Sequence, residues 1–296
     1  MKANLHTHSK YSDGTQWPEE IVARARKIGL HQMALTDHDC MEGVEPFIMA
    51  AQKAGIQAIA GVEIDCVAPE IKYNSEVMGY FPNGNWTHTR EFCLKRIEHR
   101  EKRIKKLISL ASDHFQADLS FEELKAYKIG TPPPSLKDPL ISYSKPDLYN
   151  YLMKRKKLIP EDMDYGVFKK LPFLANDQYP KPSVREVIAI ILRDTGIPVL
   201  PHPGLIFERN IDRMKTEGFD IFAWFKHAGI RALECNYYKE KDKDNTRELN
   251  HLTQQFARKL DLKISWGSDC HGPGHNSDTL EIFWGTRGFP FPGIWG

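Results

Sequence analysis

The chain has 296 residues and a formal net charge of +2, and 27% of its residues are charged. A charge so near zero does not favour nucleic-acid binding over the whole surface. No apolar run approaches the roughly 20 residues of a membrane helix, and the N-terminus does not match a signal peptide. Five cysteines without a CxxC pair argue against a disulfide framework. We therefore expect a cytoplasmic protein without a membrane partner, and the composition does not predict its oligomeric state.

Short apolar strands alternate with helices of about a dozen residues in the first and last thirds of the chain. The strands are predicted at 3–6, 33–36, 56–64, 76–80, 197–200, 231–235 and 263–266, and the helices at 18–28, 44–55, 183–194 and 245–260. Such alternation is typical of parallel βαβ units. The fold class is therefore α/β, with a sheet that is either open or closed into a barrel.

The alternation stops between residues 87 and 174. A helix is predicted at 90–111 with an apolar stripe on one face, and eight basic but only three acidic residues lie between Arg90 and Lys106. A proline-rich loop at 131–134 and a second basic cluster at 154–157 follow. We interpret 87–174 as a mainly helical inserted subdomain, with 1–86 and 175–296 forming the α/β domain.

Residues that can bind metals gather at the predicted strands. The first strand leads into His6 and His8, and Asp13 lies in the loop that follows. Because the carboxyl ends of parallel strands meet on one face of an α/β fold, residues from separate strands can share one site. The remaining candidates lie at or beside other strands, and they are His38, Glu63, Glu76, His202, Asp269 and His271. The sequence therefore predicts a site with nine metal ligands.

Each motif alone has a simpler explanation. A single histidine at a strand end is more often a structural hydrogen-bonding residue, and HxH arises whenever alternate strand residues share a face. These explanations would have to hold separately at six strands, in a chain with only twelve histidines. Nine ligands exceed the roughly four to six that one ion takes, so we expect two or three divalent ions with a bridging carboxylate. Mixed imidazole and carboxylate ligands suit Mn, Fe or Zn.

Five motifs occur in a characteristic order. They are HTHSKYSDG at 6–14, TDHD at 36–39, GVE at 61–63, HPG at 202–204 and GSDCHG at 267–272. Over nearly its whole length the chain resembles the polymerase-and-histidinol-phosphatase (PHP) family of metal-dependent phosphoesterases. The resemblance implies a distorted seven-stranded β/α barrel with a trinuclear metal centre. The subgroup with the greatest likeness acts on nucleoside 5′-phosphates and 3′,5′-bisphosphates, and some of its members trim short RNA 5′ ends.

The resemblance also assigns the ligands to three ions. The first ion would be held by His6, His8, Glu63 and Asp269. The second would share Glu63 as a bridge and would also take Glu76 and His202. The third would be held by Asp13, His38 and His271.

The chain departs from the subgroup at two motifs. It reads SEVMGY at 75–80 where relatives read VHILGY, so Glu76 replaces a histidine ligand. The extra negative charge favours a harder ion such as Mn or Fe over Zn. The chain reads SKPDLY at 144–149 where relatives read GRPHIA, so Lys145 replaces an arginine and Asp147 replaces a histidine. A lysine meets phosphate as a point charge, without the bidentate geometry of arginine.

The predicted reaction is hydrolysis of a phosphate monoester of a nucleotide or a similar small molecule. Clustered divalent ions lower the pKa of a bound water, so that hydroxide can attack near neutral pH. Asp37 and Asp39 are candidates for orienting the ligand imidazoles, with turn formation and helix capping as the alternative. By resemblance, Arg100, Arg103 and Lys145 lie where relatives bind the substrate phosphate.

Three alternatives remain open at this stage. One is a 5′-3′ exonuclease on short RNA or DNA, in which the basic face of the helix at 90–106 guides the strand; a solvated surface is the simpler explanation of that face. Another is a phosphatase of the histidinol-phosphate type. The third is a non-catalytic metal-nucleotide sensor, if Glu76 and Asp147 have disrupted the site.

Overall fold

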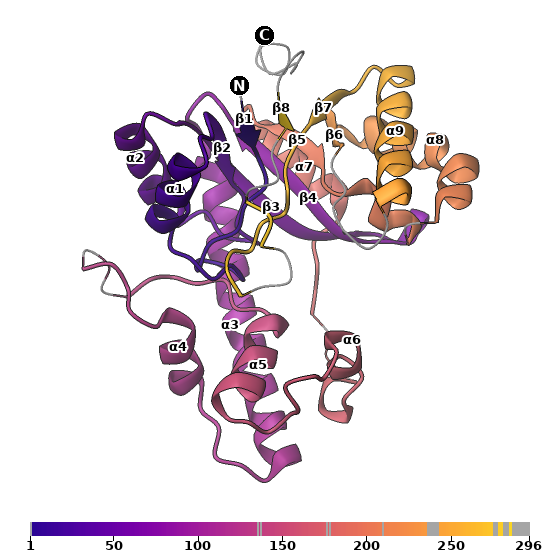
Figure 1. Ribbon diagram of the computed structural model, residues 1–296. Coiled ribbons are helices and arrows are strands. Elements are labelled where there is room, and N and C mark those ends of the chain that lie inside the picture. The colour runs from indigo at the N-terminus through magenta and orange to yellow at the C-terminus, as the bar shows by residue number, and fades with distance from the viewer. Residues whose placement is uncertain are drawn as a thin grey trace.

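The computed structural model describes residues 2–134, 136, 138–175, 177, 179–208, 210–235, 243–274, 278–280 and 284–285. Its central element is an eight-stranded mixed sheet with the order β7-β6-β5-β4-β3-β2-β1-β8. The strands are β1 (Lys2–Asn4), β2 (Gln32–Leu35), β3 (Gln57–Ala68), β4 (Tyr73–Phe81), β5 (Ile197–Leu200), β6 (Ala232–Glu234), β7 (Lys263–Ser265) and β8 (Trp284–Gly285). Figure 1 shows helices on both sides of this sheet and a separate helical part beneath it. The predicted α/β class is confirmed.

One feature of the sheet differs from the prediction of parallel βαβ units. Strand β4 runs antiparallel to both β3 and β5. The segment joining β3 to β4 contains only a short 3₁₀ turn, Pro69–Ile71, and a parallel crossover needs a dozen or more residues. The chain therefore turns back on itself, and β4 begins at the edge where β3 ends. Glu76 lies near the start of its strand and still reaches that edge.

The two ends of the run from β1 to β7 approach each other. The Leu5 amide donates to the Trp266 carbonyl at 3.0 Å, and Thr7 and Cys270 form a parallel bridge. The His8 amide donates to the Cys270 carbonyl at 2.8 Å. These bonds join the chain after β1 to the chain after β7, as the predicted distorted barrel requires. They also bring the first and last ligand motifs together.

The helices beside the strands follow the expected end signals. They are α1 (Pro18–Lys27), α2 (Val44–Ala54), α7 (Val184–Arg193), α8 (Ile211–Ala228) and α9 (Lys243–Lys259). Helix α1 begins at Pro18, with glutamates in its first turn and basic residues in its last, which suits the helix dipole. Helix α2 is followed by Gly55, whose φ of 70° is a left-handed conformation that glycine adopts without strain. Helix α8 was not among the predicted elements.

The chain between β4 and β5 forms the helical part beneath the sheet (Figure 1). Its helices are α3 (Thr87–Phe115), α4 (Phe121–Ile129), α5 (Lys145–Asn150) and α6 (Tyr165–Phe168). The second half of α3 packs with the other helices around a hydrophobic cluster drawn from residues 104–174, whereas Cys93 in its first half packs in the core of the sheet. The long helix expected at 90–111 is therefore present. The subdomain boundaries at 87 and 174 stay a prediction, because α3 contributes to both cores.

Helix α3 is fixed at its first turn by a carboxylate from another part of the chain. Asp194 is buried and accepts hydrogen bonds from the Thr89 amide at 2.7 Å, the His88 amide at 3.1 Å and the Thr89 hydroxyl at 2.8 Å. The first amides of a helix lack intrahelical partners, so a carboxylate there is stabilising.

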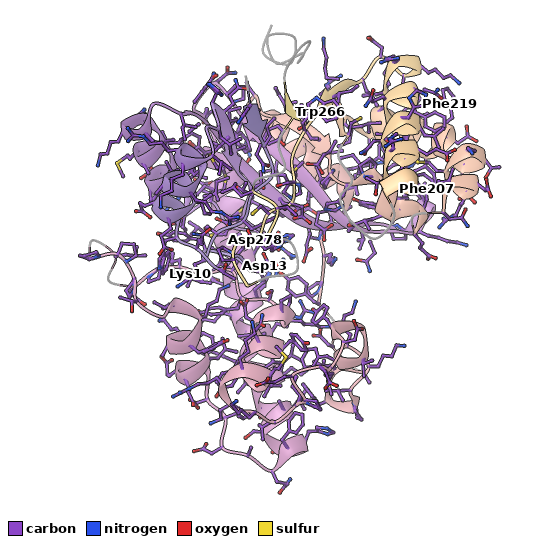
Figure 2. The ribbon with its side chains drawn as sticks, in the orientation of Figure 1. Lys10, Asp13, Phe207, Phe219, Trp266 and Asp278 are labelled. Carbon is purple, nitrogen blue, oxygen red and sulfur yellow. The ribbon has the colours of Figure 1, made fainter. Side chains whose placement is uncertain are left out.

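The helical part is also tied to the loop after β1, which carries Asp13. The bonds run from Lys10 Nζ to the Ile129 carbonyl (3.1 Å), from Lys128 Nζ to the Gly14 carbonyl (3.4 Å), from Trp17 Nε1 to the Thr131 carbonyl (3.3 Å) and from the Ser142 amide to the Tyr11 carbonyl (2.9 Å). Figure 2 shows Lys10 and Asp13 at the level where the sheet meets the helical part. Within the described residues, no helix has the length and apolar character needed to span a membrane.

Candidate metal centre

All nine predicted ligands lie together at one edge of the sheet. They form three overlapping groups, and the donor atoms within a group are all within 4.8 Å of one another. The groups are His6, His8, Glu63 and Asp269; Glu63, Glu76 and His202; and His8, Asp13, His38 and His271. They match the three sets expected from the family resemblance, with His8 common to two of them.

The first group is built by the HxH motif, by Glu63 in the middle of β3 and by Asp269 in the segment after β7. His6 and His8 are alternate residues of an extended segment, so their rings face the same side. His6 Nε2 lies 3.1 Å from Glu63 Oε2 and 3.5 Å from Asp269 Oδ1. His8 Nε2 lies 3.3 Å and 3.0 Å from the same two oxygens. Two imidazoles and two carboxylates thus converge on one point.

Glu63 connects the first group to the second. Its Oε1 lies 3.0 Å from His202 Nε2, and that nitrogen lies 3.9 Å from Glu76 Oε2. Because each oxygen of Glu63 faces a different group, this carboxylate is placed to bridge two cations.

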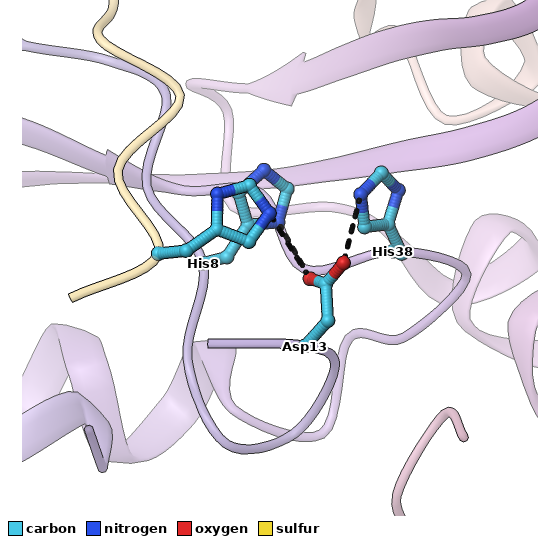
Figure 3. A group of neighbouring side chains, drawn as sticks. His8, Asp13 and His38 are labelled. Carbon is cyan, nitrogen blue, oxygen red and sulfur yellow. Dashed lines mark ion pairs between the residues drawn. The ribbon is translucent and has the colours of Figure 1, made fainter. Parts of the chain in front are cut away.

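Asp13 is the centre of the third group. Its Oδ1 lies 3.3 Å from His271 Nε2 and 3.9 Å from His8 Nδ1, and its Oδ2 lies 3.7 Å from His38 Nε2. Figure 3 shows the Asp13 carboxylate pointing at the rings above it. The His8 ring stacks between His38 and His271, with centroid distances of 4.6 Å and 4.3 Å.

A further carboxylate, Asp65, was not among the predicted ligands. It forms a group with His38 and Glu76, and it lies directly opposite Glu76 across the β3–β4 ladder. Like charges facing each other across a ladder are destabilising unless they are compensated. The sequence signal was present, because Asp65 is two residues after Glu63 and therefore shares its face of the strand.

The protein groups alone create a strong field for cations. Burial would raise the pKa values of Asp13, Glu63 and Asp269, but the surrounding histidines hold them well below their usual range. Burial would lower the pKa of His8, yet Asp269 and Glu63 raise it to about 10, and the pKa of His202 is raised in the same way to about 9. Burial and the charge of Glu63 raise the pKa of Glu76. Positive charge at this edge is thus strongly favoured.

Three imidazole nitrogens at this edge provide a test of the fit to metal ions. His8 Nδ1, His8 Nε2 and His38 Nδ1 are buried and have no hydrogen-bond partner among the described residues. A buried polar atom without a partner is costly and needs an explanation. Carboxylate oxygens stand 3.0 to 3.9 Å away but outside hydrogen-bonding geometry. A cation between nitrogen and oxygen would bind the lone pairs of both, so these residues fit divalent ions.

The two aspartates beside His38 have contacts other than those expected. Asp37 accepts hydrogen bonds from the Ser9 amide, the Ser9 hydroxyl and the Ser12 hydroxyl, each at 2.6 Å. It therefore holds the loop that carries the first ligands, and does not orient an imidazole. Asp39 is paired with Arg96 at 3.2 Å and Arg100 at 2.7 Å. Its role is to anchor helix α3.

The predicted substrate contacts are engaged with acidic residues of the same chain. Arg100 is buried, and it donates to Asp65 at 2.7 Å as well as to Asp39. Arg103 and Lys145 both pair with Asp177, and the Lys145 Nζ–Asp177 Oδ2 distance is 2.7 Å. Burial would raise the pKa of Asp177, but these two cations lower it. Arg100 is thus structural, whereas Arg103 and Lys145 are partly exposed.

Asp147, which replaces a histidine of relatives, has a structural role in this chain. Its carboxylate accepts from the Ser144 amide and hydroxyl, both at 2.8 Å, at the start of α5. It also pairs with Lys128 at 2.7 Å. This residue caps α5 and joins it to α4, so its contacts do not disrupt the ligand groups.

The cysteines offer no alternative chemistry at this edge. All five are buried and free, and burial raises the pKa of each thiol. A thiol must ionise to act as a nucleophile. Cys270, although it lies between Asp269 and His271, packs in a hydrophobic cluster with Leu35 and Phe47.

The chain is similar to several known proteins. Over 92% of its length it is 21% identical to a phosphoribosyl 1,2-cyclic phosphate 1,2-diphosphodiesterase of Eggerthella lenta, covering 95% of that protein. Over 95% it is 25% identical to a 5′-3′ exoribonuclease of Haemophilus influenzae, covering 96% of it. A shorter stretch, 21% of each chain, is 43% identical to a 3′,5′-nucleoside bisphosphate phosphatase of Chromobacterium violaceum.

Comparison with solved structures and family models agrees with the geometry. The fold matches an amidohydrolase of Chromobacterium violaceum with a TM-score of 0.75 at 21% identity, covering 98% of this chain and 93% of that one. Residues 4–145, which include the ligands from His6 to Glu76, match the model of the PHP domain. Residues 4–145 therefore form a PHP domain, in agreement with the motifs found in the sequence.

Proposed function

We propose that this protein hydrolyses a phosphate monoester of a nucleotide or a similar small phosphorylated molecule, with two or three divalent ions held by the nine ligands. The observation that carries the proposal is the sharing of Glu63. Its two oxygens face different ligand groups, which is the arrangement that clustered ions need. Sites of this kind serve in-line displacement at phosphorus.

The bound ions would supply Lewis acidity and would lower the pKa of coordinated water. The nine histidine, aspartate and glutamate ligands would hold these ions, and none of the nine is a cysteine. Glu76, facing both Glu63 and Asp65, makes the second group richer in carboxylate than a histidine would. Carboxylate oxygen favours harder ions, so Mn or Fe is expected ahead of Zn.

A partly exposed cluster of two cations supports an anionic substrate. Arg103 and Lys145 share Asp177, and neither is fully buried. Tyr165 lies within electrostatic reach of both Asp13 and Arg103: burial raises the pKa of its hydroxyl, Asp13 adds to the effect and Arg103 opposes it. The cluster and the third ligand group thus act on the same hydroxyl, and we expect a substrate phosphate bound by the ions to displace Asp177 from Arg103 and Lys145.

The similar proteins share one substrate feature. Each of the three relatives acts, by its name, on a molecule that contains a phosphorylated ribose. We therefore expect a ribose phosphate, and favour a small molecule over RNA. The reason is that two arginines of the basic helix, Arg96 and Arg100, are buried and pair with Asp39. The basic surface of α3 that is free to contact an RNA strand is therefore smaller than the number of basic residues in the helix implies.

The test is release of phosphate by purified protein whose metal content has been measured. The panel comprises a nucleoside 3′,5′-bisphosphate, a nucleoside 5′-phosphate, histidinol phosphate, a ribose cyclic phosphate and a 5′-phosphorylated RNA. We expect two or three equivalents of metal and turnover of a ribose phosphomonoester. Asp13→Asn should lose one equivalent and most of the activity. A single equivalent of metal, or none after expression with added metal, would contradict the multinuclear centre.

Two variants test the substrate contacts. Lys145→Ala and Arg103→Ala should lower kcat/KM roughly 10- to 150-fold, because each phosphate contact is a charge-assisted hydrogen bond of about 1.5–3 kcal/mol, and should leave the metal content unchanged. Lys157→Ala is the matched control, since Lys157 pairs with Glu161 on the exposed surface. A steep fall of affinity with salt, with RNA turned over faster than mononucleotides, would instead identify an exonuclease.

A further inference from the structure

Glu234, the last residue of β6, connects two ligand-bearing segments through a single buried carboxylate. Its Oε1 lies 3.0 Å from His6 Nδ1, and its Oε2 accepts a hydrogen bond from the backbone amide of His202 at 2.8 Å. The side chain is only 1% exposed, so both contacts are shielded from water. His6 follows β1 and His202 follows β5, so the carboxylate spans segments distant in sequence.

The contact with His6 determines which ring nitrogen carries the proton. A carboxylate can only accept, so Nδ1 must donate, and when the ring is neutral, as in a metal ligand, Nε2 keeps its lone pair. Nε2 lies 3.1 Å from Glu63 Oε2, so a cation placed between them would bind that lone pair. A carboxylate behind a metal-binding histidine acts in this way at many metal sites.

The contact with His202 fixes a strained backbone. His202 has a φ of 30°, in the left-handed region that residues other than glycine rarely adopt, and it precedes Pro203. The bond from its amide to Glu234 holds this conformation, and the ring then reaches Glu63 Oε1 at 3.0 Å. The His6 and His202 rings are stacked, 5.7 Å apart at an interplanar angle of 26°.

Gly267 provides the space for this arrangement. A Cβ atom at that position would lie 2.2 Å from His6 Cβ and 2.7 Å from Glu234 Oε1. Non-bonded atoms cannot lie so close together. A residue larger than glycine at position 267 would therefore push His6 and Glu234 apart. The contact between His6 and Glu234 thus also depends on the glycine at position 267.

We propose that Glu234 is a positioning residue for the first two metal sites. It fixes His6 as the tautomer with a free Nε2, and it holds His202 so that both Nε2 atoms face the two oxygens of Glu63. This inference rests on the metal centre of the proposed function. It predicts that loss of Glu234 affects the first two metal sites and not the third. Glu234 contacts His6 and His202, and in the described contacts it touches none of Asp13, His38 and His271.

The test variant is Glu234→Gln, which keeps the size of the side chain. The amide oxygen can accept from His6 or from His202, but the amide nitrogen must then face the other donor. One bond is therefore lost, or His6 takes the wrong tautomer. Equilibrium dialysis against Zn²⁺ should show affinity lowered about 10- to 100-fold for two ions and unchanged for the third. The control is Asp194→Asn, which removes the buried carboxylate at the first turn of α3 and should bind Zn²⁺ normally.

A second measurement applies even if the variant does not fold. ¹⁵N NMR of the Zn²⁺-loaded wild-type protein should show His6 protonated at Nδ1 and not at Nε2. A His6 ring protonated at Nε2, or Zn²⁺ affinities in a folded Glu234→Gln protein equal to those of the wild type, would overturn the inference. Failure of the wild type to bind any of Zn²⁺, Mn²⁺ and Fe²⁺ would instead refute the proposed function, so the two failures are distinguishable.

Discussion

The buried ion-pair network around Asp39 gives a quantitative prediction about stability. Asp39 is fully buried, and its Oδ2 accepts from Arg100 Nε at 2.7 Å and from an Arg96 terminal nitrogen at 3.2 Å. Its Oδ1 accepts from the Asp65 amide at 3.2 Å. The backbone at Asp39 has a φ of 50°, which asparagine tolerates well. Asp39→Asn therefore removes the charge while preserving shape and backbone.

The magnitude follows from what remains after the change. Removing one partner of a buried ion pair costs about 3–5 kcal/mol, because the other charge stays buried without compensation. Arg100 keeps Asp65 at 2.7 Å, and Arg96 keeps the Pro180 carbonyl at 2.9 Å, so we expect the lower end, about 3 kcal/mol. The free energy of unfolding is obtained from urea denaturation of the metal-free protein.

A matched control is the ion pair of Arg90, another arginine of helix α3, with Glu42. Glu42 pairs with Arg90 through two bonds of 2.7 Å and 3.0 Å, but 46% of the Arg90 side chain is exposed. Glu42→Gln should cost less than about 1 kcal/mol, as for other surface pairs. If Asp39→Asn costs no more than Glu42→Gln, burial does not govern these pairs, and the structural role of Arg100 is refuted.

Three further predictions concern metals and pH. At pH 7 the raised pKa values of His8 (about 10) and His202 (about 9) keep both rings protonated in metal-free protein. Metal binding should therefore release protons and become tighter as pH rises. Calorimetry in buffers of different ionisation enthalpy measures the protons released, and a value of zero would contradict this prediction. Glu76→Ala should lose one metal ion and most of the activity, whereas Glu76→His should keep the ion and shift the metal preference toward Zn. Elemental analysis after growth in mixed metals checks both variants. Unchanged metal content and rate in Glu76→Ala would show that Glu76 is not a ligand. Burial would raise the pKa of Asp194, but hydrogen bonds from Thr89 and His88 hold it below its ordinary value, so its stabilising contribution is present above about pH 4 and is lost as pH falls through the folded pKa. Asp194→Asn should accordingly lower the unfolding free energy at pH 7 and narrow the difference from wild type below pH 4; a difference that does not change with pH would exclude this cause.

The sequence by itself determined which residues could form the centre, and its motifs carried the resemblance to PHP-domain proteins. His6, His8 and Asp13 lie within one short segment, and the other candidates lie at or beside predicted strands. Parallel strands bring their ends to one edge whatever the details of packing, so the gathering of most of the nine residues could be predicted. Glu76 is the exception, because it reaches that edge from the start of antiparallel β4. Their role as ligands stays a prediction, since only metal binding tests it.

Local signals also determined most of the helix and strand positions. Pro18 at the start of α1, and Gly55 after α2, act through backbone conformation alone, which depends on near neighbours. The direction of β4 could not be predicted from local signals. It depends on whether the link between β3 and β4 is long enough for a parallel crossover, and this link is too short.

The partners of the charged side chains were decided only by the tertiary structure. Arg100 was predicted to bind substrate, but it is buried between Asp39 and Asp65. Asp39 was a candidate for orienting an imidazole, with turn formation or helix capping as the alternative, and its partners are two arginines of α3. Glu234 was not predicted to have a role, although it ends a strand at the ligand edge. An arginine in a sequence can pair with any carboxylate, and the choice among them is made by burial, since a charge removed from water must find its partner where the packing places it.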